Sequence, residues 1–394
     1  MTVTMKSIPG RHFLQIPGPT NVPDRILRAM HRAQEDHRSS AHPALTNSIL
    51  ERLPKIIGQE HGQCFVFPSS GTGMWEAALV NTLDPGARLL APRFGQFSHL
   101  FIQTARNLGY QVDVIEETWG DAASPHRIEQ ALRNDPTHEI KGVLLVHNET
   151  ATGVTTDVAA VRNAINRASH PALLYVDGVS SIASLDFRFD EWQVDMAITG
   201  SQKGFMMPAG LGILGASVRA LSLIDTARTP RSYFDLRPMR DQNSRGYFPF
   251  TPALSLLFGL DEALDMLLGE GMDNVAARHR HLADGVRAAV SAWGLQQVAT
   301  RPEIASNTVT GVRAPDGIDA AHIIDIAFRR HNLSLGGGLG ELAGKVFRIG
   351  HLGDLNELML AGSLAGVEMS LLDAGVSVEP GSGVGAAIRS WRNR

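Results

Sequence analysis

Short apolar segments alternate with longer stretches of helical periodicity through most of this 394-residue chain. The apolar segments are bounded by glycine or polar residues, as strands are. They are residues 64–67, 88–91, 142–147, 172–176 and 196–199. Strands that are apolar on both faces and alternate with helices are typical of a parallel sheet covered by helices on both sides. The pattern therefore predicts an α/β fold, with ligands bound at the ends of the strands.

The pattern changes near residue 263. A long helical stretch over roughly residues 275–293 precedes strand-like segments such as 306–312 and 346–349, with a helix between them. We predict an N-terminal arm (1–22), a large domain (23–262) and a smaller α+β domain (263–394). No repeat or low-complexity linker separates the two domains, so we expect close packing and a site in the cleft between them.

Composition excludes several classes of partner. The net charge is −4 and the basic residues form no runs, so nucleic acid is not expected to bind. No apolar stretch reaches the roughly 18 residues that a membrane span requires. The single cysteine, Cys64, cannot form an intramolecular disulfide, and the first residues lack the apolar core of a secretory signal. These features predict a cytoplasmic protein.

Lys203 is the first candidate catalytic residue. It follows the apolar residues 196–198 and lies among small residues in the sequence Thr-Gly-Ser-Gln-Lys-Gly. Partial burial lowers the pKa of a lysine, because desolvation disfavours the ammonium form, and only the neutral amine forms a Schiff base. A solvated surface lysine is the alternative.

Asp177 and a hydroxyl-rich turn are the next candidates. Asp177 ends the apolar segment 172–176, where a carboxylate is costly unless it is paired. The turn Ser-Ser-Gly-Thr-Gly at 69–73 precedes a helical run at 75–82, and the free N–H groups of a helix start bind phosphate. A turn-capping aspartate and an ordinary helix cap are the alternatives. The turn lacks the Lys-Ser/Thr ending of a nucleotide P-loop, and the glycines at 336–340 follow no convincing βα unit.

The order of phosphate turn, aspartate and lysine resembles the class V aminotransferases of pyridoxal-phosphate (PLP) fold type I. Among these, the chain is most similar to the serine–glyoxylate and alanine–glyoxylate aminotransferases, from about Pro17 to His351. The resemblance implies a mainly parallel seven-stranded sheet between helices, with a smaller α+β C-terminal domain. It also implies PLP as the cofactor and no metal.

The resemblance also implies roles for individual residues. Lys203 would form the Schiff base, and Asp177 would pair with the pyridine nitrogen. The other predicted cofactor contacts are Ser70, Gly71, Thr72 and Gln202 at the phosphate and Phe97 stacked on the ring. A core phenylalanine is the alternative for Phe97.

The segment His-Asn-Glu-Thr-Ala-Thr-Gly at 147–153 resembles the family motif in which a hydroxyl reaches the phenolic oxygen of the cofactor. Thr150 is the preferred candidate, and Thr152 either shares this role or stabilises the turn. Arg348 would bind the substrate α-carboxylate through a two-pronged fork, completed by backbone groups of Pro17 and Gly18. A buried structural salt bridge is the alternative for Arg348.

The segment 247–252 resembles the one that reaches the cofactor phosphate of a neighbouring subunit, through Thr251 and Tyr247. This implies a homodimer with shared active sites. Some family members have Tyr at the position of Phe248; in this chain that phosphate hydrogen bond is either absent or supplied by Tyr247, while Thr251 remains.

The predicted reaction transfers an amino group from a small L-amino acid to glyoxylate. Serine is the favoured donor, with aspartate and alanine as alternatives. Arg38 either binds the second carboxylate of a donor such as aspartate or is a solvated charge in a loop. A cysteine desulfurase would need a reactive thiol, and Cys64 lies in an apolar strand. A non-catalytic regulator of the same fold is a further alternative. A metal hydrolase is the last one; His279 and His281 are its candidate ligands, but no cluster of carboxylates accompanies them in the sequence.

Overall fold

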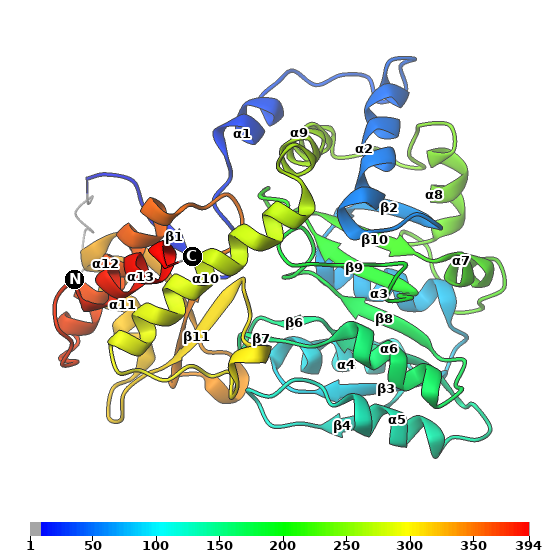
Figure 1. Cartoon of the computed structure of the whole chain (residues 1–394). Coiled ribbons are helices and arrows are strands. Elements are labelled where there is room, and N and C mark those ends of the chain that lie inside the picture. The colour runs from blue at the N-terminus through cyan, green and yellow to red at the C-terminus, as the bar shows by residue number, and fades with distance from the viewer. Residues whose placement is uncertain (1–8, 394) are drawn as a thin grey trace, which may run out of the picture.

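The computed structural model describes residues 9–393. Its larger sheet contains seven strands in the order β2-β10-β9-β8-β5-β3-β4 (Figure 1). The strands are β2 (Gln63–Ser69), β3 (Arg88–Arg93), β4 (Gln111–Glu116), β5 (Ile140–Val146), β8 (Leu173–Asp177), β9 (Met196–Gly200) and β10 (Gly210–Ala216). All neighbouring pairs are parallel except those of β10, which runs antiparallel to β9 and β2. The predicted α/β class and the mainly parallel seven-stranded sheet are confirmed.

The five segments expected as strands all fall within this sheet, whereas β4 and β10 were not expected. β4 lies at the edge, and most of its residues are only partly buried, so its apolar signal is weak. β10 reads Gly-Leu-Gly-Ile-Leu-Gly-Ala, and glycine in a strand weakens the sequence pattern.

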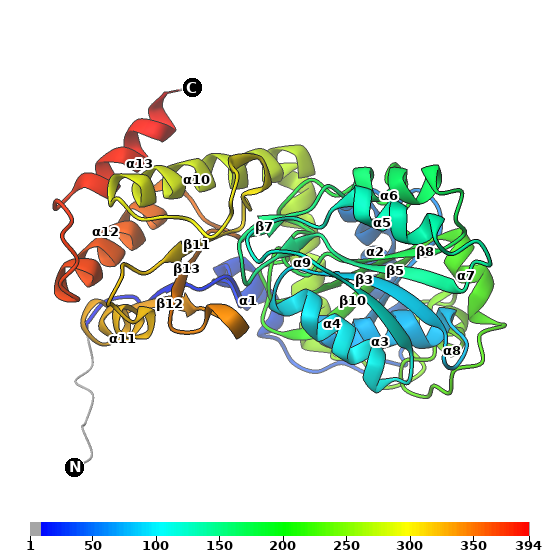
Figure 2. The ribbon, with the colours of Figure 1, turned by 90° about the horizontal axis from the view of Figure 1, so that it is seen from below.

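Helices cover both faces of the larger sheet (Figure 2). One face packs against α2 (His42–Ile57), α5 (Pro125–Arg133), α6 (Val158–Arg167) and α9 (Leu254–Glu270). The other packs against α3 (Gly71–Thr82), α4 (Gln96–Asn107), α7 (Val218–Ile224) and α8 (Leu236–Asn243). Each face therefore has its own apolar core, as the apolar strands predict.

A smaller sheet lies beside the larger one, with the long helix α10 (Met272–Ala292) running along it (Figures 1 and 2). Its order is β1-β12-β13-β11, so the N-terminal strand β1 joins strands from the far end of the chain. The bounds are β1 (Phe13–Gln15), β11 (Val309–Arg313), β12 (Leu333–Gly337) and β13 (Val346–Gly350), with helices α11 (Ala320–His331), α12 (Glu357–Asp373) and α13 (Ser382–Arg392). The remaining elements are α1 (Asp24–Met30) and the hairpin of β6 (Asn148–Glu149) and β7 (Val154–Thr155).

The domain boundaries stay a prediction. A boundary at residue 262 falls inside α9, where Leu260 and Leu264 both belong to the core beneath the larger sheet. We propose that the boundary instead follows α9 at Gly271, which ends that helix and begins α10 with a φ of +85°.

The topology gathers several loops at one edge of the larger sheet. Because β10 is antiparallel to both of its neighbours, β2 runs in the same direction as the other strands. The carboxyl ends of the parallel strands, among them Ser69, Asp177 and Gly200, therefore meet at that edge. This is the usual ligand-binding edge of an open α/β sheet.

Within residues 9–393, no helix combines the length and the apolar character needed to cross a membrane.

Candidate active site

Lys203 lies in the turn after β9, and it is buried. Its Nζ donates a hydrogen bond of 2.5 Å to the carbonyl oxygen of Pro17. The pKa of Lys203 is lowered to about 8, because desolvation by burial and the positive charge of Arg348 outweigh the opposing negative charges of Asp177 and Glu149. At pH 7 about a tenth of this amine is therefore unprotonated, far more than for an ordinary lysine, and only the unprotonated form is nucleophilic.

The N-terminal arm fits closely over Lys203. A Cβ atom on Gly18 would lie 2.3 Å from Cδ of Lys203, and Gly18 adopts a φ of +112°, so only glycine suits this position. Thr20 holds the arm in place: its N–H donates to the carbonyl of Gln202 at 3.1 Å and its hydroxyl to the carbonyl of Lys203 at 3.2 Å. Pro17 and Gly18 thus lie beside Lys203. Their predicted role in the pocket for the substrate carboxylate stays a prediction.

Asp177 ends β8, and its carboxylate is held by two donors. The N–H of Val179 donates to Oδ1 at 2.8 Å, and Nε1 of Trp75 donates to Oδ2 at 3.1 Å. Burial raises the pKa of Asp177 to about 7, although these two hydrogen bonds and the charge of Lys203 favour the carboxylate. A buried acid of this kind is suited to pair with a protonated ring nitrogen.

The predicted phosphate turn caps α3, which is 12 residues long. The hydroxyl of Ser70 accepts from the N–H of Gly73 at 3.4 Å, while Ser70 and Thr72 remain exposed at the edge of the sheet. A Cβ atom on Gly200 would lie 2.8 Å from Oε1 of Gln202 and 3.2 Å from the N–H nitrogen of Gly71. Glycine at position 200 therefore lets Gln202 and the start of the helix approach the end of β9 closely.

The loop after β5 holds both threonines, and their hydroxyls have different partners. The Thr150 hydroxyl donates to Oγ of Ser180 at 2.8 Å, whereas the Thr152 hydroxyl donates to the carbonyl of Glu149 at 3.4 Å. Thr152 therefore stabilises the turn, and Thr150 stays our preferred cofactor contact. Which hydroxyl contacts a cofactor stays a prediction.

Arg348 is buried in β13, and its guanidinium faces the loop that carries Thr150. Its Nε donates to the carbonyl of Gly337 at 2.8 Å and its Nη1 to the carbonyl of Thr150 at 3.0 Å. Burial lowers the pKa of Arg348 to about 10. The described residues form no salt bridge with Arg348, so its remaining N–H groups are suited to a substrate carboxylate. A Cβ atom on Gly336 would lie 2.7 Å from Cδ of Pro17 and 3.2 Å from Cβ of Arg348. Glycine at this position therefore lets the N-terminal arm and β13 pack closely against β12.

Phe97 lies in the first turn of α4, with its ring centroid 6.0 Å from Nζ of Lys203. It is half-buried and packs against the core of α3 and α4. The ring therefore lies close enough to the lysine to contact a cofactor bound there.

Tyr247 and Thr251 do not contact Lys203 within one chain. The Tyr247 hydroxyl donates to the carbonyl of Ser39 at 3.3 Å, and its ring lies 6.1 Å from that of His42 on α2. Thr251 is exposed. This geometry agrees with the predicted reach to a neighbouring subunit, which stays a prediction. Arg38 is also exposed, in the same region as Ser39.

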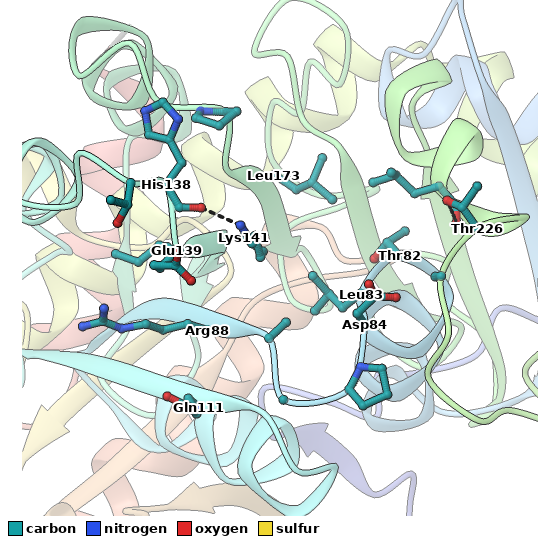
Figure 3. A pocket seen from close by; sticks show the side chains of 18 of the residues that line it. Thr82, Leu83, Asp84, Arg88, Gln111, His138, Glu139, Lys141, Leu173 and Thr226 are labelled. Carbon is teal, nitrogen blue, oxygen red and sulfur yellow. Dashed lines mark hydrogen bonds between the residues drawn. The ribbon is translucent and has the colours of Figure 1, made fainter.

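A cavity of about 990 Å³ lies at the opposite edge of the larger sheet, where β3, β4, β5 and β8 begin (Figure 3). Several of its charged side chains already have partners: Arg88 pairs with Asp113 at 2.8 Å, and Lys141 donates to the carbonyl of His138 at 2.6 Å. None of the residues that line it is among the buried polar groups left without a hydrogen bond. We therefore place the active site at the other edge.

Three contributors to this site were not found from the sequence: Trp75, Thr20 and Glu149. The sequence pattern placed Trp75 in a helix and Thr20 in a turn. Glu149 belongs to the motif at 147–153, but no role was predicted for it. Each acts through a partner far away in the chain, so no local pattern identifies it.

The residues present fit PLP. The backbone N–H of Gly71 at the start of α3 lies beside Gly200, next to the side-chain amide of Gln202, whose Oε1 has no donor among the described residues, so turning this amide over would offer its N–H groups to a phosphate. A phosphate there would meet backbone donors and the favourable end of the helix dipole. A buried lysine with a lowered pKa and a buried acid complete the set of groups that the aldehyde and the ring nitrogen need.

The pKa of Lys203 predicts how the cofactor-free protein takes up PLP. Below pH 8 the amine is mostly protonated, so the rate of covalent attachment should rise about tenfold per pH unit and level off above pH 8. Borohydride trapping at short times, followed by mass spectrometry, measures this rate. Nα-acetyl-lysine serves as the control, since its amine titrates near pH 10.4. A protein rate that keeps rising to pH 10 contradicts the lowered pKa.

The rival chemistries find less support. Cys64 is buried in β2, where burial raises its thiol pKa to about 12, so it does not provide the reactive thiolate of a desulfurase. Nδ1 of His279 pairs with the carbonyl of Val275, and Nε2 of His281 pairs with Glu357. Both histidines therefore serve the packing of α10.

Comparisons with known proteins agree with this geometry. The family model described as aminotransferase class V matches residues 12–330. A serine–glyoxylate aminotransferase from Methylorubrum extorquens is 57% identical over 96% of both chains. An L-aspartate–glyoxylate aminotransferase from Paracoccus denitrificans is 48% identical over 96% of this chain and 95% of its own.

The solved structure of a pyridoxamine–pyruvate aminotransferase from Mesorhizobium loti superimposes with a TM-score of 0.91, at 28% identity over 97% of this chain and 98% of that one. The family match runs from β1 into α11, about four fifths of the chain. This chain therefore belongs to the class V aminotransferases, a family that uses pyridoxal phosphate.

Proposed function

We propose that this chain transfers the amino group of L-serine to glyoxylate, giving glycine and a 2-keto acid. The observation that carries the proposal is the meeting of a buried lysine with a lowered pKa, a buried acid and a buried arginine at one edge of the sheet. The preference for serine rests on the 57% identity to a serine–glyoxylate aminotransferase, against 48% to an L-aspartate–glyoxylate aminotransferase.

The cofactor would be held by residues from several loops. Lys203 binds its aldehyde covalently, Asp177 pairs with its ring nitrogen, and Phe97 covers the ring. The phosphate meets Ser70, Gly71, Thr72 and Gln202. The hydroxyl of Thr150, held by Ser180, faces the phenolic oxygen, while Thr152 keeps the turn in shape.

When bound, the protonated cofactor ring withdraws electrons from the Cα atom of the amino acid. Asp177 keeps the proton on the ring nitrogen, because its carboxylate is the adjacent negative charge. Arg348 binds the α-carboxylate through its free N–H groups and so fixes the orientation of Cα. The amine of Lys203 accepts the Cα proton and later returns it, which requires a pKa near the working pH.

A panel of donors tests this function. Purified, PLP-loaded protein is mixed with L-serine, L-aspartate, L-alanine or L-cysteine, first without an acceptor and then with glyoxylate. We expect serine to change the cofactor absorbance most rapidly and glyoxylate to restore it. A faster response to aspartate or alanine would reassign the donor, and no response to any of them would favour the regulator hypothesis.

We also propose a homodimer in which Thr251 and Tyr247 complete the phosphate site of the partner subunit. Their position away from Lys203 in one chain supports this arrangement. A cytoplasmic location stays a prediction, supported by the single, buried cysteine.

Mixed dimers test the shared site. Lys203→Ala removes the lysine of one site, and Thr251→Glu places a negative charge against the phosphate of the other. We expect each variant alone to be nearly inactive and their co-expressed mixture to recover about a quarter of the wild-type activity, because half of the dimers then have one intact site. Size-exclusion chromatography checks that both variants dimerise. A mixture that recovers no activity would show that each site is built from one chain.

A further inference from the structure

Glu149 is a fully buried carboxylate at the end of β6, next to the site but not assigned to it. It accepts three backbone hydrogen bonds, from Phe97 at 3.2 Å, Ser98 at 2.9 Å and Ala151 at 3.1 Å. Two of these N–H groups belong to the first turn of α4, and the third belongs to the loop after β6. The side chain therefore joins two segments that are about 50 positions apart in the chain.

Both segments carry residues of the site. The first turn of α4 carries Phe97, whose ring centroid lies 6.0 Å from Nζ of Lys203. The loop after β6 presents the carbonyl of Thr150, which accepts from Nη1 of Arg348 at 3.0 Å. Movement of the Glu149 carboxylate would thus be passed on to both Phe97 and Arg348.

The contact between Glu149 and α4 is tight. A Cβ atom on Gly95 would lie 2.2 Å from Cγ of Glu149 and 2.3 Å from its Cδ. Glycine at position 95 therefore lets the carboxylate reach the N–H groups of the helix, where the helix dipole favours a negative charge. The φ of Gly95 is extended, so its smallness, not its backbone freedom, is what the contact needs.

Glu149 also balances the charges of the site. Its negative charge favours the protonated forms of Arg348 and Lys203, and it opposes the ionisation of Asp177. Burial raises the pKa of Glu149, while the hydrogen bonds from Ser98, Ala151 and Phe97 lower it. The described site thus holds two cations and two acids in one buried cluster.

We propose that Glu149 is a positioning residue for substrate recognition, which holds Arg348 ready for the substrate carboxylate and Phe97 against the cofactor ring. The proposal rests on the proposed function, since it assigns those two residues to substrate and cofactor. Glu149 itself touches neither of them.

The small domain supplies a matched control. Glu368 is also buried, and its carboxylate accepts from Nε1 of Trp293 and from the N–H of Gly383, both at 2.8 Å, at the start of α13. Neither partner contributes to the site. Glu368→Gln should therefore disturb a helix start in the same way as Glu149→Gln, without any effect on substrate binding.

The test measures the binding of propionate, an unreactive carboxylate, to PLP-loaded protein by calorimetry, together with the affinity of the cofactor-free protein for PLP. Glu149→Gln should weaken propionate binding about tenfold and PLP binding by a smaller factor, because misplaced hydrogen bonds to charged groups lose much of their strength. Arg348→Gln should weaken propionate binding at least as much. Glu368→Gln should lower the melting temperature but leave both dissociation constants unchanged.

Gly95→Ala provides a second test that does not remove the charge. The added methyl group must displace the Glu149 carboxylate, so propionate binding should weaken here too, even if Glu149→Gln proves too unstable to purify. Unchanged propionate binding in Gly95→Ala or in folded Glu149→Gln would overturn the proposal, and so would an equal loss in Glu368→Gln. A wild-type protein that takes up no PLP would instead overturn the proposed function, and the role of Glu149 with it.

Discussion

Replacing Lys203 with alanine should lower kcat by at least about 10⁴-fold, because the residue both holds the cofactor and moves the Cα proton. The structure supports both tasks. The amine is buried, its pKa is lowered to about 8, and its position is fixed by the carbonyl of Pro17. Steady-state kinetics with L-serine and glyoxylate measures the loss.

A second readout identifies the bond itself. Borohydride reduction of the wild-type holoenzyme should attach the cofactor to the peptide that contains Lys203, and the variant should carry no label there. Lys345→Ala is the matched control, since Lys345 is exposed and donates only to the carbonyl of Glu341. Turnover of the Lys203 variant above about one per cent of wild type would refute the assigned role.

Replacing Asp177 with asparagine should lower kcat by about 10³-fold, equivalent to about 4 kcal/mol of transition-state stabilisation. Asparagine keeps the shape of the side chain and an oxygen for the N–H of Val179, but it carries no negative charge. The ring nitrogen then loses its proton, and with it much of its ability to withdraw electrons from Cα.

Rapid mixing with L-serine measures the first half-reaction of this variant directly, by the change in cofactor absorbance. Asp113→Asn is the control, because Asp113 pairs with Arg88 at the opposite edge of the sheet. A half-reaction within about threefold of the wild-type rate would mean that Asp177 serves only to hold the start of the next turn.

Several features of the fold followed from local pattern alone. The apolar segments predicted β2, β3, β5, β8 and β9, and the residues at their ends identified Asp177 and Lys203 as candidates. β10 was not predicted, because three of its seven residues are glycine. The small-domain strands β11 and β13 were expected, but the pairing of β1 with β12 was not.

The ends of several strands, and the polar groups that follow them, could be read from the amino-acid sequence, because a strand buried on both faces needs a continuous apolar run. How these polar groups meet depends on the packing of the folded chain. Lys203 contacts Pro17 from 186 positions away, and Arg348 contacts Thr150 from 198 positions away. Such contacts depend on how separate elements pack, and on small residues such as Gly18, Gly95 and Gly336 that allow close approach. No periodicity along the chain encodes that packing. The contact of Glu149 with α4, for example, requires α4 and β6 to lie side by side.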